Sequence, residues 1–340
     1  MLNKLILNII LPLIIVLPVL VLCIAIYTYS ERKGLASIQK RRGPNIVGFL
    51  GLGQPFADGI KLLLKEHLLP AKADKLIFIT APVIAFTFSL SSWLFIPIIN
   101  FGEILQSNIA LLLIFGFSSV SAYGIILAGW ASNSKYSMLG TLRATAQLIA
   151  YEIVLSLTIL PIIFAAKTLS LSQMVWAQEF HGWYIIPFFP SFLLFSIAAV
   201  AETNRPPFDL PEAEAELVAG YFVEYSAMSF ALFFLAEYAH MILMSHMIVV
   251  LFLGGWNILA SLLILPIFQP FYNFVFYIIK LSFSFFYFIW LRATFPRFRY
   301  DQLMQLGWKV LLPITLFWIL YSISFLWTFG FKYGNFIPIW

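Results

Sequence analysis

Seven acidic side chains and a single basic one, Arg205, lie between residues 202 and 237. The acids are Glu202, Asp209, Glu212, Glu214, Glu216, Glu224 and Glu237. A carboxylate inside an apolar membrane helix is costly and commonly marks a path for protons or ions. A solvated acidic loop at 203–216 explains Asp209, Glu212 and Glu214, but we expect Glu224 and Glu237 to lie inside an apolar helix. The cluster therefore predicts a proton path.

Polar side chains also recur along the apolar segment 144–166. Arg143, Gln147 and Tyr151 are spaced so that they share one face of a helix. Glu152 lies about half a turn around that helix from Arg143, so the two are poorly placed to neutralise each other. Glu152 therefore needs another partner, either in the proton path or on a neighbouring helix.

The segment 31–75 is a polar loop with a short amphipathic helix in it. The loop opens with Glu31-Arg32-Lys33 and includes Gln39. From Pro55 onward, apolar side chains share one helix face and charged ones lie opposite. The apolar residues are Phe56, Ala57, Ile60, Leu63, Leu64 and Leu68, and the charged ones are Asp58, Lys61, Lys65 and Glu66. This helix is too short to span a bilayer, so we expect it at the membrane surface, either as an anchor or as a wall where an amphiphilic ligand passes between lipid and water.

A second basic loop covers 292–308, where Arg292, Arg297 and Arg299 accompany Asp301. Arginine at a helix end is an ordinary membrane anchor. The alternative interpretation is a surface that docks an acidic partner.

Membrane helices must position these residues, because 62% of the 340 residues are hydrophobic, 10% are charged and the mean hydropathy is +0.94. A span needs about 20 apolar residues. We expect eight spans, near 5–29, 76–99, 109–131, 144–166, 184–202, 217–240, 271–292 and 308–330. Residues 241–268, which Gly254-Gly255 and Pro266 interrupt, are expected to form a partly buried connection, with a ninth span as the alternative. The predicted fold is a single all-α membrane domain, 1–340: a polytopic transmembrane helix bundle of eight spans plus one interfacial amphipathic helix.

The distribution of charge predicts the topology. With eight spans, the loops after the first, third, fifth and seventh share one side of the membrane. These loops and the adjoining helix ends carry every Lys and Arg except Lys4, Lys167, Lys280 and Lys332. The positive-inside rule places that side in the cytoplasm or the mitochondrial matrix, with both termini opposite. A ninth span would reverse the side of Arg292, Arg297, Arg299 and Lys309, which favours eight.

Several kinds of chemistry are excluded by residue type. Cys23 is the only cysteine, so no thiolate set exists for an iron–sulfur cluster or structural zinc. The histidines show no paired metal-ligand spacing, and the order of Gly48, Gly51 and Gly53 does not match a phosphate-binding loop. We expect no metal site, no bound nucleotide and no nucleic-acid partner, so any redox centre must belong to another protein.

Four long blocks carry most of the charged residues. They read ERKGLASIQKRRGPNIVGFLGLGQPFADGIKL from Glu31, YSMLGTLRATAQLIAYE from Tyr136, AETNRPPFDLPEAEAELVAGYFVEYS from Ala201 and RATFPRFRYDQLMQLGWK from Arg292. In this order and spacing they resemble a membrane subunit of respiratory complex I, the H subunit of NADH–quinone oxidoreductase, which in mitochondria is called NADH dehydrogenase chain 1. Gly53 and Phe222 depart from the Leu and Asn expected at those positions, but neither removes an ionisable group.

The resemblance implies a subunit at the heel of the membrane arm, beneath the peripheral arm, that forms much of a quinone chamber. The residues near its entrance would be Gln39, Phe56, Asp58 and Lys61, and Arg205 and Arg297 would face the chamber. The acidic route from the chamber would consist of Glu152, Glu202, Asp209, Glu212, Glu214, Glu216, Glu224 and Glu237. Quinone would be the substrate, whereas NADH, FMN and the iron–sulfur clusters would bind to partner subunits. The partners implied are the peripheral quinone-site subunits, neighbouring small membrane subunits and lipid.

The resemblance also implies a mechanism in which quinone receives electrons from a neighbouring subunit. The resulting change of charge would start proton translocation through the carboxylates. The implied location is the mitochondrial inner membrane, with the termini on the intermembrane-space side, or alternatively a bacterial plasma membrane. Two other functions stay open: the membrane subunit of an energy-converting hydrogenase, which does not use quinone, and a stand-alone proton or ion transporter. The segment 31–75 and the RYDQLM block favour the quinone enzyme.

Overall fold

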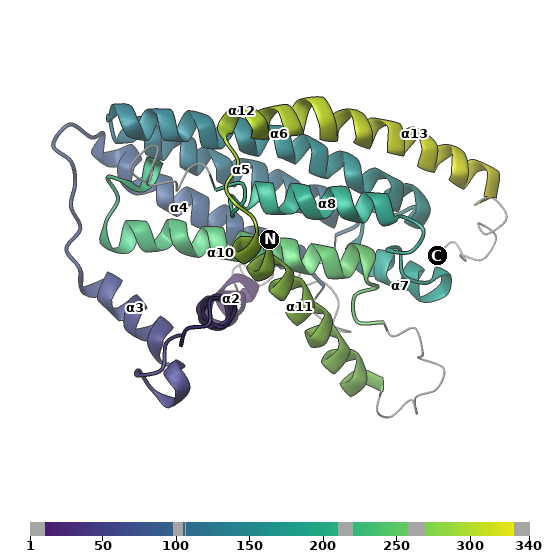
Figure 1. The fold of residues 1–340 in the computed structure, drawn as a ribbon, viewed down its shortest axis with the longest axis horizontal. Coiled ribbons are helices and arrows are strands. Elements are labelled where there is room, and N and C mark those ends of the chain that lie inside the picture. Colours follow the sequence, from purple (N-terminus) through teal and green to yellow (C-terminus); the bar gives the residue numbers. More distant parts are fainter. Residues whose placement is uncertain (1–10, 98–104, 106, 210–219, 258–268, 330–340) are drawn as a thin grey trace.

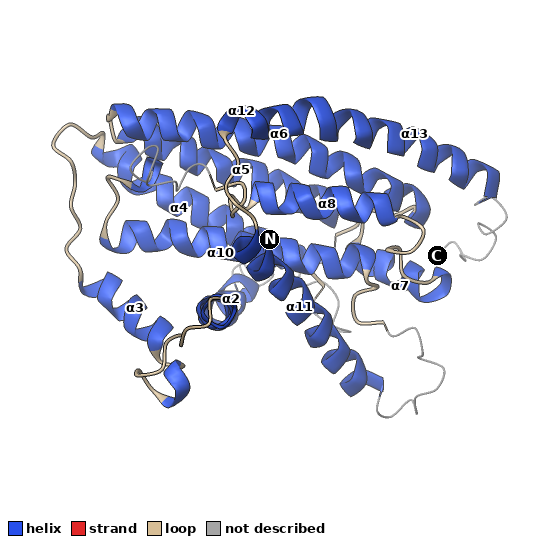
Figure 2. Cartoon of the chain, in the orientation of Figure 1, coloured by secondary structure: helices blue, strands red, loops and turns tan. Residues whose placement is uncertain are grey.

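The computed structural model describes residues 11–97, 105, 107–209, 220–257 and 269–329. Every element in these ranges is a helix (Figures 1 and 2). The longer ones are α2 (Leu11–Ile38), α3 (Gln54–Leu64), α4 (Lys75–Ser92), α5 (Ala110–Ala131), α6 (Lys135–Ala166), α7 (Leu171–His181), α8 (Phe189–Glu202), α10 (Ala227–Phe252), α11 (Gln269–Thr294), α12 (Tyr300–Gln305) and α13 (Leu312–Phe329). Short helical turns lie at η2 (Phe49–Gly51), η3 (Trp93–Phe95), η5 (Gly220–Phe222) and η7 (Leu306–Leu311).

Six of these helical stretches are long and apolar enough to cross a membrane. They are Lys75–Phe95, Ala110–Ala131, Lys135–Ala166, Ala227–Phe252, Gln269–Thr294 and Tyr300–Thr328. The predicted polytopic all-α bundle is therefore confirmed. The two remaining predicted spans overlap with α2, which has 28 residues, and with α8, a shorter apolar helix of 14.

Most of the long helices lie roughly along the long axis of the molecule (Figure 1). In that view α4, α5, α6, α8, α10 and α13 form the upper part of the bundle, and α2 is seen end-on. Helix α11 runs at a steep angle from the lower right to the middle of the view, where its end overlaps α10. The helix α10 is the most buried of the spanning helices, because 78% of its apolar window lies inside the molecule. It therefore forms the centre around which the polar residues are arranged.

The predicted boundaries of this central helix were wrong. We expected a span at 217–240 and a partly buried connection at 241–268, but α10 begins at Ala227 and runs to Phe252. Apolar composition alone does not mark the turn at residues 223–226, which separates η5 from α10 and ends at Ala227, where φ is 56°. Residues 241–252 are the second half of α10 and not the start of a ninth span, while 258–268 lie outside the described residues.

The amphipathic helix predicted from Pro55 is present as α3, with Pro55 in its first turn. It lies apart from the main bundle and joins α4 through a long connection (Figure 1). None of its residues is buried, and Phe56, Ile60 and Leu64 are among its exposed apolar side chains. Such a face suits the boundary between lipid and water.

Small residues allow the helices next to α10 to approach closely. A Cβ on Gly124 of α5 would lie 2.7 Å from the Cβ of Ala85 on α4, and one on Gly129 would lie 2.1 Å from Cγ2 of Thr141 on α6. Backbone contact of this kind replaces the hydrophobic driving force that helices lack inside lipid. The close packing of α4, α5 and α6 brings their polar side chains together beside α10.

Candidate functional site

A charged cluster lies where α2, α10, α11 and the loop after α8 meet. The carboxylate of Glu31 on α2 accepts a hydrogen bond from Arg292 on α11 and lies 3.5 Å from the guanidinium of Arg205. The hydroxyl of Tyr238 donates to the same carboxylate at 2.7 Å, and its ring lies 4.3 Å from the Arg205 guanidinium. Arg205 also forms an ion pair with Glu237 at 3.0 Å. Glu31 and Arg205 are only 4 and 5% exposed, so every charge in the cluster depends on its neighbours.

A partly open cavity of about 70 Å³ adjoins this cluster. The carboxylate and imidazole groups that line it belong to Glu152 of α6, Glu202 of α8, and Glu237 and His240 of α10. One buried water needs roughly 10–15 Å³ of accessible volume, so the cavity has room for several. Glu237 lines the cavity and also pairs with Arg205, which makes it the direct link between the two polar centres.

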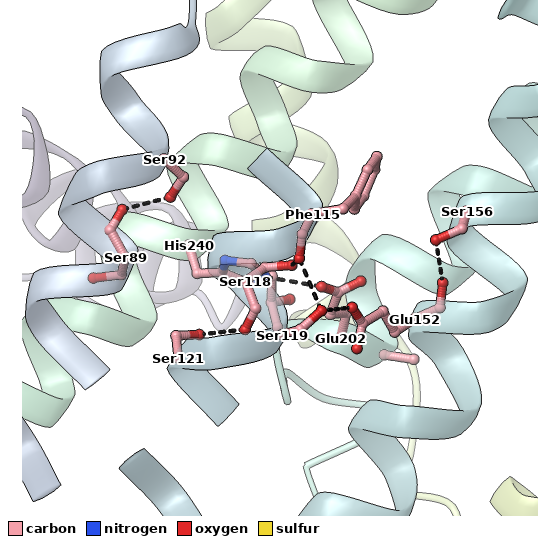
Figure 3. A network of polar contacts seen from close by, with 12 residues as sticks. Ser89, Ser92, Phe115, Ser118, Ser119, Ser121, Glu152, Ser156, Glu202 and His240 are labelled. Atoms are coloured by element: carbon pink, nitrogen blue, oxygen red, sulfur yellow. Dashed lines mark hydrogen bonds and ion pairs between the residues drawn. The ribbon is translucent and has the colours of Figure 1, made fainter. Parts of the chain in front are cut away.

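Hydrogen bonds connect the acids of the cavity to polar side chains around them (Figure 3). His240 lies 3.2 Å from the Glu202 carboxylate, and the Ser119 hydroxyl of α5 donates to Glu152. Oε2 of Glu202 and Nδ1 of His240 are buried without a partner among the described residues. Buried polar atoms are normally satisfied by protein or ordered water, so these two atoms are suited to bind water in the cavity.

The loop after α8 is held by buried side chains of α6. The Gln147 amide donates to the carbonyls of Ala201 and Phe208, at 2.8 and 2.9 Å. Next to Phe208, the Asp209 carboxylate forms an ion pair with Arg297 at 3.2 Å. This arrangement brings the predicted acidic and basic loops together on one side of the bundle.

The loop after α2 is also held by contacts between charged and polar groups. Helix α2 continues to Ile38, so the first residues of the predicted loop 31–75 are helical. Arg32 on α2 forms an ion pair with Asp58 on α3 at 2.6 Å. The Arg41 side chain donates to Gln39 at 2.7 Å, and Lys61 and Phe56 are exposed. These residues lie outside the buried cluster, so the structure brings together only part of the predicted site.

One acid lies elsewhere than expected. Glu224 is half-buried in the turn before α10, not inside an apolar helix, because α10 begins three residues later. Glu212, Glu214 and Glu216 lie outside the described residues. Of the predicted acids, the structure therefore gathers Glu152, Glu202 and Glu237 around one cavity and places Asp209 at the nearby loop.

Sequence reasoning assigned no site role to five residues of this site: Glu31, Arg292, His240, Tyr238 and Ser119. His240 follows Glu237 by one helical turn, a spacing at which side chains meet, so the sequence did contain a signal for it. Tyr238 and Ser119 carry no such signal, because their partners Glu31 and Glu152 are 207 and 33 residues away in the chain. Among the described residues no group of three or more His, Cys, Asp and Glu is placed to hold a metal ion.

Comparisons with known proteins match this chain over nearly its full length. A family profile described as NADH dehydrogenase matches residues 11–323. The chain belongs to the NADH dehydrogenase family. It is 51% identical over 316 residues to the H subunit of NADH-quinone oxidoreductase from Paramagnetospirillum magneticum, a match that covers 93% of this chain and 91% of that one. It is 52% identical over 305 residues to NADH-ubiquinone oxidoreductase chain 1 of Chondrus crispus, covering 90% and 92% of the two chains.

This membership in the NADH dehydrogenase family confirms the resemblance carried by the four sequence blocks. The protein is thus a multi-pass membrane subunit of the NADH-quinone oxidoreductase type, respiratory complex I. Bacterial relatives named as the H subunit and a relative named chain 1 match it about equally well.

Proposed function

We propose that this chain forms much of the quinone chamber of complex I and couples quinone reduction to proton translocation through its buried carboxylates. One observation carries the proposal: Glu237 is shared between the charged cluster around Arg205 and the cavity lined by Glu152, Glu202 and His240. A change of charge at one centre therefore acts directly on a proton-binding group of the other.

The physical basis is electrostatic coupling between buried groups. Arg205 is shared as a counter-charge by the carboxylates of Glu31 and Glu237, which lie 3.5 and 3.0 Å from it. When a quinone near Arg205 gains negative charge, the guanidinium also interacts with that charge. Its attraction for the Glu237 carboxylate is then weaker. Glu237 then takes up a proton, and water in the cavity passes protons between it, His240, Glu202 and Glu152. Asp209, Glu212, Glu214, Glu216 and Glu224 complete the proposed route.

The entrance of the chamber is assigned to the segment around α3. Phe56 and its apolar neighbours are exposed on a surface helix, a position from which a lipid-soluble quinone reaches the polar interior. Asp58, Lys61 and Gln39 supply polar groups at that entrance, while Arg205 and Arg297 face the headgroup end. Electrons come from NADH through FMN and iron–sulfur clusters in the peripheral partner subunits, and this chain itself transfers none.

The proposed location is the mitochondrial inner membrane, with a bacterial plasma membrane as the alternative. In either membrane the loops rich in Lys and Arg face the compartment that holds the peripheral arm. Neighbouring small membrane subunits continue the acidic route.

The test is to replace Glu237 by Gln in the assembled complex. The amide keeps the shape of the side chain but binds no proton, so we expect quinone reductase activity and proton pumping to fall together by roughly tenfold or more. NADH oxidation with ferricyanide, which needs only the peripheral arm, should remain unchanged. Glu179→Gln on the exposed face of α7 is the matched control. Wild-type proton pumping in Glu237→Gln would contradict the proposal.

A further inference from the structure

A row of polar residues continues beyond the acidic cavity between α4 and α10. Ser89 of α4 and His240 of α10 both line the cavity. Further along both helices, Trp93 of η3 and His246 of α10 contact each other, with ring centroids 4.9 Å apart at 76°. Between these two levels the hydroxyl of Ser92, fully buried, donates to the Ser89 carbonyl at 2.7 Å (Figure 3). The two helices therefore lead from the cavity to a second polar centre at His246.

Three buried polar side chains meet at this centre. The His246 ring contacts Trp93 and also the ring of Tyr277 on α11, at 5.9 Å between centroids. Trp93, His246 and Tyr277 are 5, 8 and 2% exposed. The indole nitrogen of Trp93 and the hydroxyl of Tyr277 are buried without hydrogen-bond partners among the described residues. Leaving such groups unsatisfied is costly, about 1–3 kcal/mol each, so each of them is expected to bind a polar ligand such as water.

The hydrogen-bonding capacities of the three side chains are complementary. Nδ1 of His246 lies 2.9 Å from the carbonyl of Ile242, which can only accept, so Nδ1 carries a hydrogen. In the neutral ring Nε2 is then an acceptor, the Trp93 indole is a donor, and the Tyr277 hydroxyl serves as either. A water molecule, which typically makes two to four hydrogen bonds in such sites, fits this set.

We propose that Trp93, His246 and Tyr277 form a second water-binding proton-relay site, in which His246 takes up and releases the proton. This inference rests on the proposed proton path and extends it along α10. His246 is six residues beyond His240, or about 9 Å along the helix axis. The chain then carries its own polar route from the acidic cavity toward the opposite face of the membrane.

The experiment uses the whole complex, reconstituted into liposomes. His246→Leu removes the relay group, and Trp93→Phe combined with Tyr277→Phe removes both hydrogen-bonding partners but keeps the aromatic rings. Phe285→Leu is the matched control, because the Phe285 ring lies 6.5 Å from the His246 ring and carries no polar atom. We expect proton uptake and quinone reductase activity to fall roughly tenfold in the first two variants, as loss of one hydrogen-bonded step implies. Ferricyanide reduction and the Phe285→Leu control should stay at the wild-type level.

The outcomes separate this inference from the function on which it rests. Wild-type proton uptake in the Trp93/Tyr277 variant, with Glu237→Gln still impaired, would overturn the second site and leave the acidic route standing. Wild-type uptake in both would overturn both proposals. If the complex with His246→Leu fails to assemble, proton uptake by the single variant Tyr277→Phe is the deciding measurement, because this change removes only one oxygen atom from the site. Wild-type uptake in that variant would overturn the second site.

Discussion

The Glu31 carboxylate contacts Arg205, Arg292 and Tyr238, which come from three other parts of the chain. The sequence pointed to a group of acids as a predicted proton path, yet it did not pair Glu31 with its partners, because they lie 174, 261 and 207 positions away. The local sequence indicates whether a residue is charged and whether it lies in an apolar segment, whereas the packing of the helices determines which residue becomes its partner. That is why Glu202 and Glu237 were predicted and the role of Glu31 was not.

The Glu31 carboxylate is open to a direct stability test. In Glu31→Gln the two arginines face each other without their shared counter-charge. Breaking a fully buried pair costs roughly 3–5 kcal/mol, and less is expected here because Arg292 is 34% exposed. We expect a lower melting temperature of the purified complex. The double variant Glu31→Gln with Arg292→Gln should recover part of it, and a double variant no more stable than the single one would contradict this account.

At the scale of elements, α10 combines three roles along its length. Its first half carries Glu237, Tyr238 and His240, its second half carries His246, and its end turns at Gly254 and Gly255, both with positive φ. Composition predicted that an apolar helix lies here, but not its limits. A hydropathy window averages over the boundary, whereas the actual ends depend on turns that only a few backbone angles define.

The end of α10 is stabilised by a buried lysine of α11. The Lys280 ammonium donates to the carbonyls of Leu253, Gly255 and Asn257, at 2.7, 2.9 and 2.7 Å. In Lys280→Met these carbonyls lose their donor, at about 1–3 kcal/mol for each group left unsatisfied. We therefore expect faster proteolysis near Gly254 in limited digests of the complex. Lys167→Met, at an exposed helix end, is the control and should digest like the wild type.

At the scale of the whole molecule, charge is distributed unevenly between the two ends of the bundle. The loops after α2, α5, α8 and α11, together with the adjoining helix ends, carry every Lys and Arg except Lys4, Lys167, Lys280 and Lys332. The ion pairs of Arg32 with Asp58 and of Arg297 with Asp209 link these regions to their neighbours. The eight-span topology predicts that these loops share one side of the membrane.

Cysteine labelling tests that topology, because Cys23 is the only native cysteine. In a Cys23→Ser background, Arg41→Cys and Lys135→Cys should react with an impermeant maleimide from the same side of the membrane. Lys167→Cys should react from the opposite side. Labelling of Arg41→Cys and Lys135→Cys from different sides would refute the predicted arrangement of spans.

Glu237 has one further consequence, because a group shared by two centres transmits energy in both directions. Binding of a ligand beside Arg205 changes the proton affinity of the cavity by a certain coupling free energy. Thermodynamic linkage requires that protonation of the cavity changes the affinity for that ligand by the same free energy. Coupling through such a residue is reversible and favours neither direction by itself. In the proposed coupling, the balance of membrane potential against redox potential would decide whether quinone is reduced or its reduced form is oxidised.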